Sequence, residues 1–311
     1  MLRHALVVFC FVWTLAAAAD SYDFPVVLPP FQDKAYKNGS DSGSCLFYLE
    51  SLIVNVFAKK DSNPQAAGAV IGSRGDDNKP TVNKYNWKDE YATCIKDSQK
   101  PTGDTFTPQN FSFVLDVQVG DGGGVARSAD KAKTYFTVQS PVQLKLNFAT
   151  TLGYGWTLQS IELPQGLTVK SGGDSWLSTD LSVPANTVSN DSLAYMGMGT
   201  YGAYNWGCSR SKTIAFKVND DYAVGIQFGN VQIQAFNRFV ATGGDLEGQT
   251  RFGQLTSDCI GTFSAGSWMG IIVSLVLISV MMFGYLMLNS VGTVDRFDDP
   301  KQKQLVINAK E

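Results

Sequence analysis

The stretch FSFVLDVQV at 111–119 has an apolar residue at every second position. These residues are Phe111, Phe113, Leu115, Val117 and Val119. Successive side chains of a β-strand point to opposite faces of its sheet, so a period of two predicts a strand with one buried face. We therefore expect residues 111–119 to form a core strand of a β-rich domain.

Four further stretches repeat this alternation. VQLKLNF (142–148) places Gln143, Lys145 and Asn147 on the outward face of its strand, and TIAFKVN (213–219) alternates in the same way. VGIQF (224–228) and VQIQAF (231–236) also alternate, but their phase breaks at Gly229-Asn230. A break of phase between two alternating runs predicts a β-bulge or a tight turn.

Glycine- and asparagine-rich breakers separate these strands, and no helical periodicity of useful length occurs outside the C-terminal apolar stretch. Residues 44–263 therefore predict an all-β domain, either one large β-sandwich or prism-like unit or two related halves with one disulfide each. Residues 20–43 are rich in Pro, Asp, Ser and Gly and predict an extended N-terminal lead-in.

Residues 1–19 have the features of a cleaved secretory signal peptide: Arg3, an apolar run from Leu6 to Leu15, and small residues near Ala19. Cleavage removes His4, the only histidine. The mature chain then has no imidazole for a nucleophilic triad, a metal site or a histidine pH switch. We expect no catalytic residue, no metal, no cofactor and no small-molecule substrate, and no basic patch predicts nucleic-acid binding.

Four cysteines remain after cleavage: Cys45, Cys94, Cys208 and Cys259. An even number in a secretory protein predicts two disulfides, and three pairings are possible. The distance in sequence from Cys45 to Cys94 is similar to that from Cys208 to Cys259, and this spacing favours local bridges. In the loop-entropy model each such bridge adds roughly 4 kcal/mol to the stability of the fold. No two cysteines are close enough in sequence for a zinc knuckle.

Residues 260–294 carry no charged side chain, and WMGIIVSLVLISVMMFGYLML (268–288) is almost wholly apolar. A helix of this length spans roughly 31 Å, which matches the hydrocarbon core of a bilayer. We expect a transmembrane helix at 266–288 in contact with lipid, a lumenal N-terminus and a cytosolic tail at 289–311. Lysines and arginines in the tail agree with this type I orientation.

Two kinds of residue pattern relate to this topology. Gly266, Gly270 and Ser274 recur every four residues, which favours close approach of a partner helix, although chance glycine usage gives the same pattern. The N-glycosylation sequons are at Asn38, Asn110 and Asn190, all on the expected lumenal side.

Three other motifs have simpler explanations. SRGDD (73–77) contains the integrin tripeptide but lies in an ordinary polar turn, and GDGGG (120–124) lacks the lysine of a phosphate loop. MGMGTYGAYNWGC (196–208) is compatible with a carbohydrate-stacking surface, but a packed strand whose glycines admit large neighbours is favoured. Nothing singles out a glycosidase-like pair of carboxylates.

The lumenal domain resembles the membrane-proximal domain of the lysosome-associated membrane glycoproteins. The resemblance is carried by NWGCSRSKTIAF (205–216), GNVQIQAF (229–236), FGQLTSDC (252–259) and SCLFYLESLIVNV (44–56). It implies a β-prism fold with bridges Cys45–Cys94 and Cys208–Cys259.

The tail carries a second resemblance. The motif DRFDDPK closely follows the span and is similar to the end of the accessory subunits of vacuolar proton-pumping ATPases. It consists of Asp295, Arg296, Phe297, Asp298, Asp299, Pro300 and Lys301. Longer members of that family carry a further N-terminal lumenal domain, whereas here only residues 20–44 separate the signal peptide from Cys45, and no multibasic cleavage site is present.

Together, the resemblances imply a non-catalytic accessory subunit of the V-type proton ATPase. It would dock on membrane-sector subunits of that pump in endomembranes and support assembly, targeting or regulation of acidification. The alternative is a free-standing lysosomal membrane glycoprotein of the protective-coat type. Such a protein should end in a tyrosine-based sorting signal, and residues 289–311 contain no tyrosine.

Overall fold

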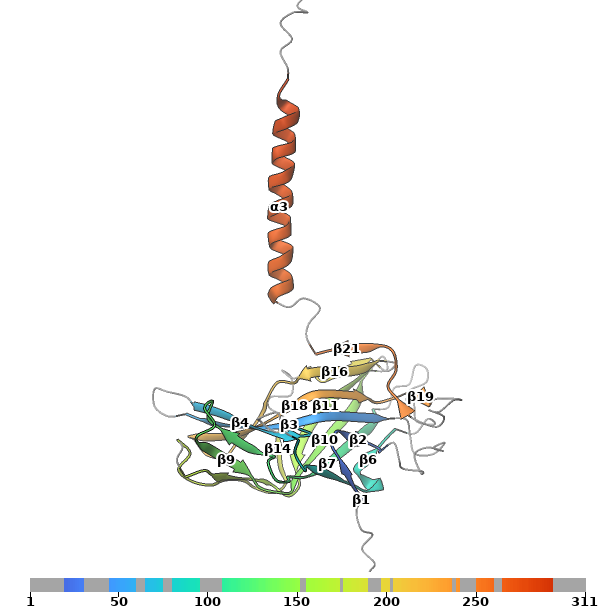
Figure 1. The fold of residues 1–311 in the computed structure, drawn as a ribbon. Coiled ribbons are helices and arrows are strands. Elements are labelled where there is room, and N and C mark those ends of the chain that lie inside the picture. Colours follow the sequence, from blue (N-terminus) through green and yellow to red (C-terminus); the bar gives the residue numbers. More distant parts are fainter. Residues whose placement is uncertain are drawn as a thin grey trace, which may run out of the picture. The chain divides into compact units, whose positions relative to one another are not determined.

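Figure 1 shows the fold of the protein in a computed structural model. The described residues are 20–30, 45–59, 65–74, 80–95, 108–151, 155–173, 176–189, 197–201, 204–236, 239–240, 250–259 and 265–292. The chain divides into two compact units, Met1–Cys259 and Ile260–Glu311, and each is considered by itself.

The first unit is a β domain of three larger sheets and a two-stranded ribbon. The first sheet contains β1 (Asp20–Asp23), β5 (Lys84–Trp87), β7 (Asn110–Gln118), β10 (Val142–Thr151), β11 (Gly155–Leu163) and β14 (Thr187–Ser189), with β6 (Ala92–Thr93) paired to β7 and β15 (Gly199–Tyr201) paired to β11. The third sheet contains β13 (Leu181–Val183), β12 (Leu167–Ser171), β9 (Thr134–Val138) and β8 (Val125–Arg127).

The second sheet contains β2 (Val26–Leu28), β3 (Leu46–Ala58), β18 (Tyr222–Gln234), β16 (Asn205–Arg210) and β21 (Thr256–Asp258), with β4 (Gln65–Gly72) paired to β3 and β17 (Ile214–Lys217) paired to β18. The ribbon is β19 (Phe239–Val240) with β20 (Thr250–Arg251). Strand pairing in the three larger sheets is antiparallel except for the parallel pair β16–β21.

The predicted alternation on β7 is confirmed, and its inward face lies at the centre of an aromatic cluster. Phe111 stacks on its cross-strand partner Phe148 of β10 with ring centroids 4.8 Å apart. Trp156 of β11 packs edge-on against both rings at 5.8 and 5.6 Å. Offset-stacked and edge-to-face pairs are the favourable aromatic geometries, so these strands are joined by packing as well as by their hydrogen bonds.

One core joins all three sheets. It includes Val117 of the first sheet, Val56 of the second and Phe136 of the third, all essentially inaccessible to solvent. The all-β prediction is therefore confirmed, and the β strands belong to one compact unit that ends at Cys259. The three sheets share one core because a sheet with an apolar face must bury it against another element.

The expected bulge or turn at Gly229-Asn230 is wrong, because β18 is one continuous strand of 13 residues. It pairs with β3 in a single register on both sides of this point, since Phe228 lies opposite Leu52 and Val231 opposite Leu49. At this point, each of the two strands changes which of its faces is buried. Asn230 has a φ of 49°, a left-handed conformation that asparagine tolerates, and this turns the strand over without inserting a residue.

Gln143 lies on the outward face, as the alternation predicts, but only 9% of this residue is exposed. The short 3₁₀ turn η1 (Asp89–Tyr91) covers this part of the outer face of the first sheet. Tyr91 donates a hydrogen bond to the Asp116 carboxylate at 3.2 Å, and Asp116 lies directly opposite Gln143. Burial, followed by the charge of Asp116, raises the pKa of Tyr91 to about 12.

Asp116 is a buried carboxylate with several hydrogen-bond donors. Besides Tyr91, it accepts hydrogen bonds from Asn86 at 3.2 Å and from Gln118 at 3.3 Å. A carboxylate that is 8% exposed needs such donors, since leaving it without partners would cost several kcal/mol. The turn that carries Tyr91 is therefore fixed to the sheet by a charged group.

The segment expected as a lead-in contributes strands to two sheets. β1 pairs with β5 in the first sheet, and β2 pairs with β3 in the second. Tyr85 of β5 links the two sheets, because its hydroxyl donates to the Val27 carbonyl at 3.2 Å and accepts from the Val27 amide at 3.3 Å. The Tyr85 ring also stacks on Tyr22. Burial raises the pKa of Tyr85 to about 12.

Both disulfides have the pairing that the resemblance implied. Cys45–Cys94 connects the residue before β3 with the residue after β6, and so links the second sheet to the first. Cys208–Cys259 lies within the second sheet and joins β16 to the residue after β21. The bridges close loops of similar length, with sequence separations of 49 and 51.

Two buried amide side chains fasten the last part of the β domain. Asn205 is fully buried, and its Nδ2 donates to the carbonyls of Gly253 at 2.8 Å and Leu255 at 2.9 Å. Its Oδ1 accepts from Gln232 at 2.7 Å. Gln234, also fully buried, accepts a hydrogen bond from the Gly253 amide at 2.8 Å. This clamp holds the chain that returns to form β21.

The raised pKa of Tyr85 predicts a loss of stability at high pH. In the unfolded chain Tyr85 loses its proton near its ordinary pKa of 10.0, whereas in the fold it keeps the proton until about 12. The folded protein then binds more protons across this window, so its free energy of unfolding falls as the pH rises from 10 to about 12. Urea unfolding at several pH values should show a shallower fall for Tyr85→Phe than for wild type. Equal slopes would contradict this role of Tyr85.

The clamp predicts that Asn205→Leu is strongly destabilising. The substitution removes the side-chain donor of the Gly253 carbonyl and the acceptor of Gln232, and should lower the free energy of unfolding by about 2–3 kcal/mol. Urea unfolding followed by tryptophan fluorescence measures the change. An exposed control, Lys170→Ala, should stay within about 0.5 kcal/mol of wild type. If Asn205→Leu were as stable as Lys170→Ala, the hydrogen bonds of Asn205 would contribute nothing to stability.

Candidate functional site

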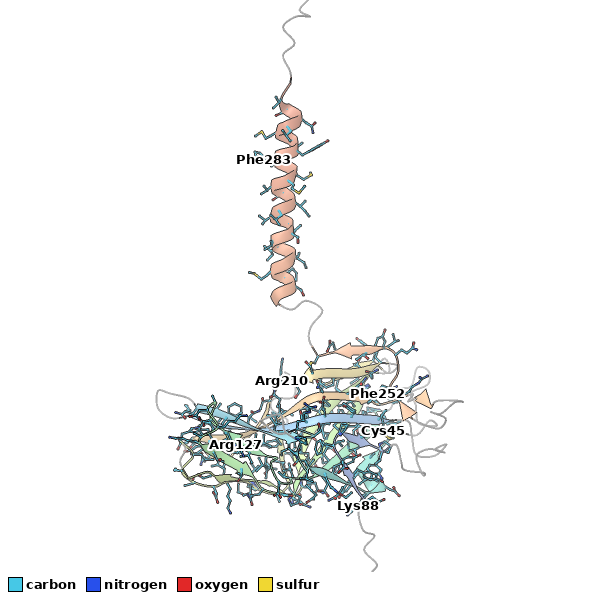
Figure 2. The ribbon with its side chains drawn as sticks, viewed as in Figure 1. Cys45, Lys88, Arg127, Arg210, Phe252 and Phe283 are labelled. Carbon is cyan, nitrogen blue, oxygen red and sulfur yellow. A yellow bond between two sulfur atoms is a disulfide. The ribbon has the colours of Figure 1, made fainter. Side chains whose placement is uncertain are left out.

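The second unit contains the helix α3 (Ala265–Ser290), whose side chains project on all sides (Figure 2). Its 26 residues extend roughly 39 Å and include no acidic or basic side chain. Every side chain from Gly266 to Gly292 is exposed in the chain by itself. An apolar helix exposed on all faces needs an apolar environment, so α3 is suited to a bilayer and to partners within it. Gly266–Ser290 is the one candidate span among the described helices.

Three serine side chains of α3 bond to the backbone of their own helix. Ser274 donates to the Gly270 carbonyl at 2.8 Å, Ser279 to the Val276 carbonyl at 2.7 Å, and Ser290 to the Met287 carbonyl at 2.8 Å. In hydrocarbon a hydroxyl without a partner would be costly. These back-bonds satisfy the three hydroxyls within α3, so these serines need no polar partner in lipid.

The predicted small-residue face is present on α3. Gly266, Gly270 and Ser274 follow one another at one-turn spacing, and a Cβ added at Gly270 would meet no atom within 4 Å. The bond from Ser274 to the Gly270 carbonyl keeps its hydroxyl against the helix. The backbone of this face is therefore open to close contact with another helix.

Gly284 extends the same face, although the four-residue spacing in the sequence did not predict it. It lies eighteen residues after Gly266, and at 3.6 residues per turn this is about five whole turns, so both glycines point in nearly the same direction. A Cβ at Gly284 would also meet no atom within 4 Å. A search for small residues beyond four-residue steps would have found it.

Aromatic residues lie near both ends of α3. Trp268 and Tyr285 are exposed, and their separation along the helix corresponds to roughly 26 Å. Tryptophan and tyrosine favour the two interfaces of a bilayer, whose hydrocarbon core is about 30 Å thick. Their spacing therefore fits a helix that crosses a membrane.

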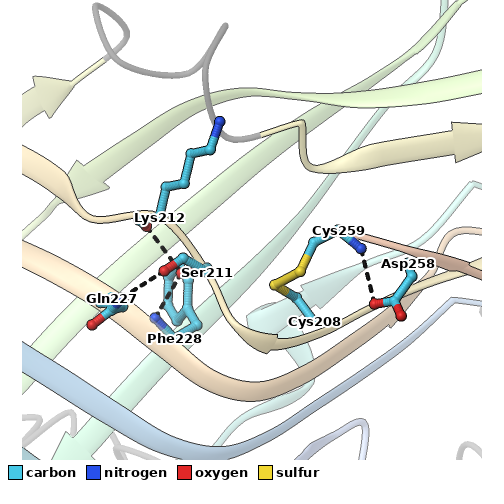
Figure 3. The surroundings of a disulfide bond; sticks show 7 residues. All are labelled: Cys208, Ser211, Lys212, Gln227, Phe228, Asp258 and Cys259. Carbon is cyan, nitrogen blue, oxygen red and sulfur yellow. Dashed lines mark hydrogen bonds between the residues drawn. A yellow bond between two sulfur atoms is a disulfide. The ribbon is translucent and has the colours of Figure 1, made fainter. Parts of the chain in front are cut away.

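The disulfide Cys208–Cys259 secures the chain immediately before the second unit (Figure 3). β21 pairs with β16 over only three residues. Beyond it, the Cys259 amide donates to the Gly207 carbonyl at 3.0 Å, and the disulfide bonds Cys259 to the neighbouring residue of β16. A three-residue edge strand is weak by itself, so the covalent bond fixes the point from which the membrane segment departs.

β16 is in turn tied to the centre of the second sheet beyond its last residue (Figure 3). Ser211 accepts a hydrogen bond from the Phe228 amide of β18 at 2.9 Å and donates to the Lys212 carbonyl at 3.0 Å. Gln227 donates to the Ser211 carbonyl at 2.6 Å. The disulfide therefore connects the C-terminal segment to the most extensively paired strand of the domain.

Of the predicted glycosylation sites, the structure describes Asn110, which is exposed at the start of β7. Asn38, Asn190 and the tail motif at 295–301 lie outside the described residues. Modification of the asparagines and the role of the tail therefore stay predictions.

The motif MGMGTYGAYNWGC divides between core and surface. Met198 and Trp206 are buried, as the packed-strand interpretation expects. Tyr201 and Tyr204 are 70% and 39% exposed, so part of the aromatic set does lie on the surface. Among the described residues, no three His, Cys, Asp or Glu side chains are grouped to hold a metal.

Comparison with known proteins gives a consistent relationship. Residues 261–299 match the family described as V0 complex accessory subunit Ac45/VOA1 transmembrane domain. A Caenorhabditis elegans protein named V-type proton ATPase subunit S1 is 35% identical over 307 residues, which are 95% of this chain and 61% of that protein. A Rattus norvegicus protein of the same name is 42% identical over 72 residues, 23% of this chain and 13% of that protein.

Among solved structures, the membrane-proximal domain of mouse lysosome-associated membrane protein 1 is similar at 14% identity and a TM-score of 0.29. The match covers 70% of this chain and 89% of that domain. A likeness this weak supports no inference about function.

The sequence relationship is stronger and covers the β domain and the helix together. The chain spans about three fifths of the nematode relative's length, 61%, and much less of the mammalian one. The chain is thus related along nearly its whole length to a nematode protein named V-type proton ATPase subunit S1, and residues 261–299 match the Ac45/VOA1 transmembrane domain.

Proposed function

We propose that this protein is a non-catalytic accessory subunit of a V-type proton ATPase. The observation that carries the proposal is the 35% identity to a subunit S1 protein over 95% of the chain, combined with the match of residues 261–299 to an accessory-subunit transmembrane domain. Its contribution would be to support assembly, targeting or regulation of the pump in acidified endomembranes.

The proposed orientation places the β domain in the lumen and residues 289–311 in the cytosol. Three features support it: the signal-like N-terminus, the two disulfides, and the sequons N-terminal to the helix. Disulfides persist in oxidising compartments and N-glycans are added in the secretory route, so both fit a lumenal domain. The lysosomal-coat alternative is not favoured, because the sequence relationships are to a V-type proton ATPase subunit S1 protein and to an accessory-subunit transmembrane domain.

The proposed docking site is the small-residue face of α3, defined by Gly266, Gly270, Ser274 and Gly284. Lipid tails are as apolar as leucine, so hydrophobicity gives little preference for a helix over lipid. Close backbone contact does give such a preference, and this face permits it. We further propose that the tail motif at 295–301 is recognised at the cytosolic surface by a pump subunit or by trafficking machinery.

The docking proposal predicts that Gly270→Leu weakens co-purification with the pump from detergent extracts. Among the described residues, and apart from the neighbouring backbone of α3 itself, no atom lies within 4 Å of a Cβ at Gly270, so a larger side chain is expected to disturb a partner. We expect recovery of membrane-sector subunits to fall at least about tenfold, equivalent to about 1.4 kcal/mol.

The matched control is Ser279→Leu, a small-to-large change on the opposite side of α3, about 180° from Gly270. This variant should co-purify like wild type. Equal losses in both variants would point to general disturbance of the helix, and no loss in either would exclude the proposed face.

The tail proposal predicts a different defect. Replacing Asp295, Asp298 and Asp299 together with alanine should reduce delivery or assembly, measured as less co-purifying pump in the organelle fraction and a higher lumenal pH. A neutral tail control, Gln302→Ala with Gln304→Ala, should behave like wild type. Normal acidification and assembly in the triple variant would refute a role for these carboxylates.

A further inference from the structure

A groove of about 360 Å³ lies on the outer face of the first sheet, and Asn110 is part of its wall. Three of its strands are β7, β10 and β11, and β6 adds Thr93 at one side. A continuous polar row crosses these strands: Thr93 lies opposite Ser112, Ser112 opposite Asn147, and Asn147 opposite Ser160. A row of hydroxyl and amide groups along one surface gives a ligand several hydrogen-bonding positions.

The groove is balanced in charge. Its Lys145 and Glu162 face one another across β10 and β11, with Nζ 3.5 Å from Oε2. Asn147 donates from Nδ2 to both Glu162 at 2.9 Å and Ser160 at 3.0 Å, so the group it can offer a ligand is its Oδ1 acceptor. One cation paired with one anion gives no preference for a charged ligand. A neutral polyhydroxyl ligand, which both donates and accepts hydrogen bonds, matches the polar groups of the groove better than a charged ligand does.

The floor of the groove is held rigidly. Phe111 and Phe148 contribute to it from strands whose rings stack on the core side, with centroids 4.8 Å apart. The register between β10 and β11 shifts at Asn147/Phe148, which leaves Gln159 as an extra residue of β11. A β-bulge of this kind re-aims side chains and widens the spacing on the bulged strand. Gln159 is fixed beside it by a 2.8 Å bond to Thr157.

Asn110 and Ser112 are the first and third residues of a sequon, and both line this groove. Residues two apart in a strand project from the same face, so a sugar attached to Asn110 would begin at the groove itself. A tethered ligand has an effective concentration of the order of millimolar, which lets individually weak hydrogen bonds hold it.

We propose that this groove binds the inner N-acetylglucosamine units of an N-glycan attached to Asn110. The proposal rests on the lumenal placement of the β domain proposed above. The glycan would lie along the polar row, with Asn147 and Ser160 as contacts, and would cover the outer face of the first sheet. The ligand class is a neutral N-acetylated sugar, held by tethering and by hydrogen bonds.

A double-mutant cycle on the full-length glycosylated chain tests the contact. Asn110→Gln removes the glycan, and Asn147→Ala removes the central groove contact. If the glycan occupies the groove, Asn110→Gln should lower the melting temperature by about 2–4 °C in the wild-type background and by less than about 1 °C in Asn147→Ala. Additive effects would mean that the glycan does not touch Asn147, and would overturn the proposal.

Two control pairs make the cycle specific. Asn38→Gln with Asn147→Ala should be additive, because it removes a different glycan. Asn110→Gln with Thr168→Ala should also be additive, since Thr168 pairs with Ser182 on the third sheet and not on the first. If either control pair showed a coupling as large as that between Asn110→Gln and Asn147→Ala, the assignment of the glycan to this groove would be overturned.

Free sugar distinguishes the tethered ligand from one in solution. The disaccharide of two N-acetylglucosamine units, at millimolar concentration, should raise the melting temperature of Asn110→Gln and leave the glycosylated wild type unchanged. Stabilisation of the glycosylated protein would show that its groove is empty, and an unchanged Asn110→Gln would show that the groove has no affinity for this sugar. Either result contradicts the proposal.

Glycopeptide mass spectrometry separates this proposal from the proposed function. An unmodified Asn110 beside glycosylated Asn38 and Asn190 would overturn the groove proposal alone. Absence of glycan at all three sites would instead contradict the lumenal orientation. Co-purification with the pump is independent of both results.

Discussion

The antiparallel pairing of β3 with β18 is the interaction on which the rest of the β domain depends. Both strands are 13 residues long, and they stay paired in one register over their whole length. β3 also carries β2, β4 and the neighbouring Cys45, while β18 carries β16 and β17. Through β16, the clamp at Asn205 and the disulfide to Cys259, the same pair fixes the chain that leads to α3. The chain therefore leaves the domain from an edge strand that is connected through β16 to its longest strand pair.

The chemistry of the two units divides their roles. α3 satisfies the hydroxyls of Ser274, Ser279 and Ser290 internally and exposes mainly apolar or small residues. The β domain holds its buried carboxylate Asp116 in a defined hydrogen-bond network and its buried Asn205 in another. Neither unit supplies a grouped set of metal ligands in the parts of the chain that are described. The two units therefore offer different kinds of contact: α3 an apolar surface with small residues, and the β domain polar groups.

Much of the architecture was predictable from periodicity. The alternation in β7 and β10 predicted their buried faces because a strand in a one-sided sheet must place apolar residues at every second position. The burial of Gln143 could not be predicted, because the 3₁₀ turn that covers it comes from a distant part of the sequence. The left-handed conformation of Asn230 was not predicted, because it accompanies a change of buried face in two strands that are far apart in sequence. The clamp at Asn205 was not predicted, because its hydrogen bonds join segments that are far apart in sequence. The small-residue face was predicted from small residues four positions apart. Gly284 was not predicted, because it lies five helical turns from Gly266 and outside that four-residue spacing.

The central claim is that α3 docks on the pump through one face, and site-specific photocrosslinking in native membranes tests it most directly. A photoreactive amino acid at Leu277 would lie about 20° from Gly266 around the helix, and one at Leu275 about 180° away. We predict that the probe at Leu277 crosslinks to a membrane-sector subunit of the V-type proton ATPase, while the probe at Leu275 yields at least about tenfold less of that product. Equal crosslinking from both positions, or no pump subunit crosslinked from Leu277, would contradict the account.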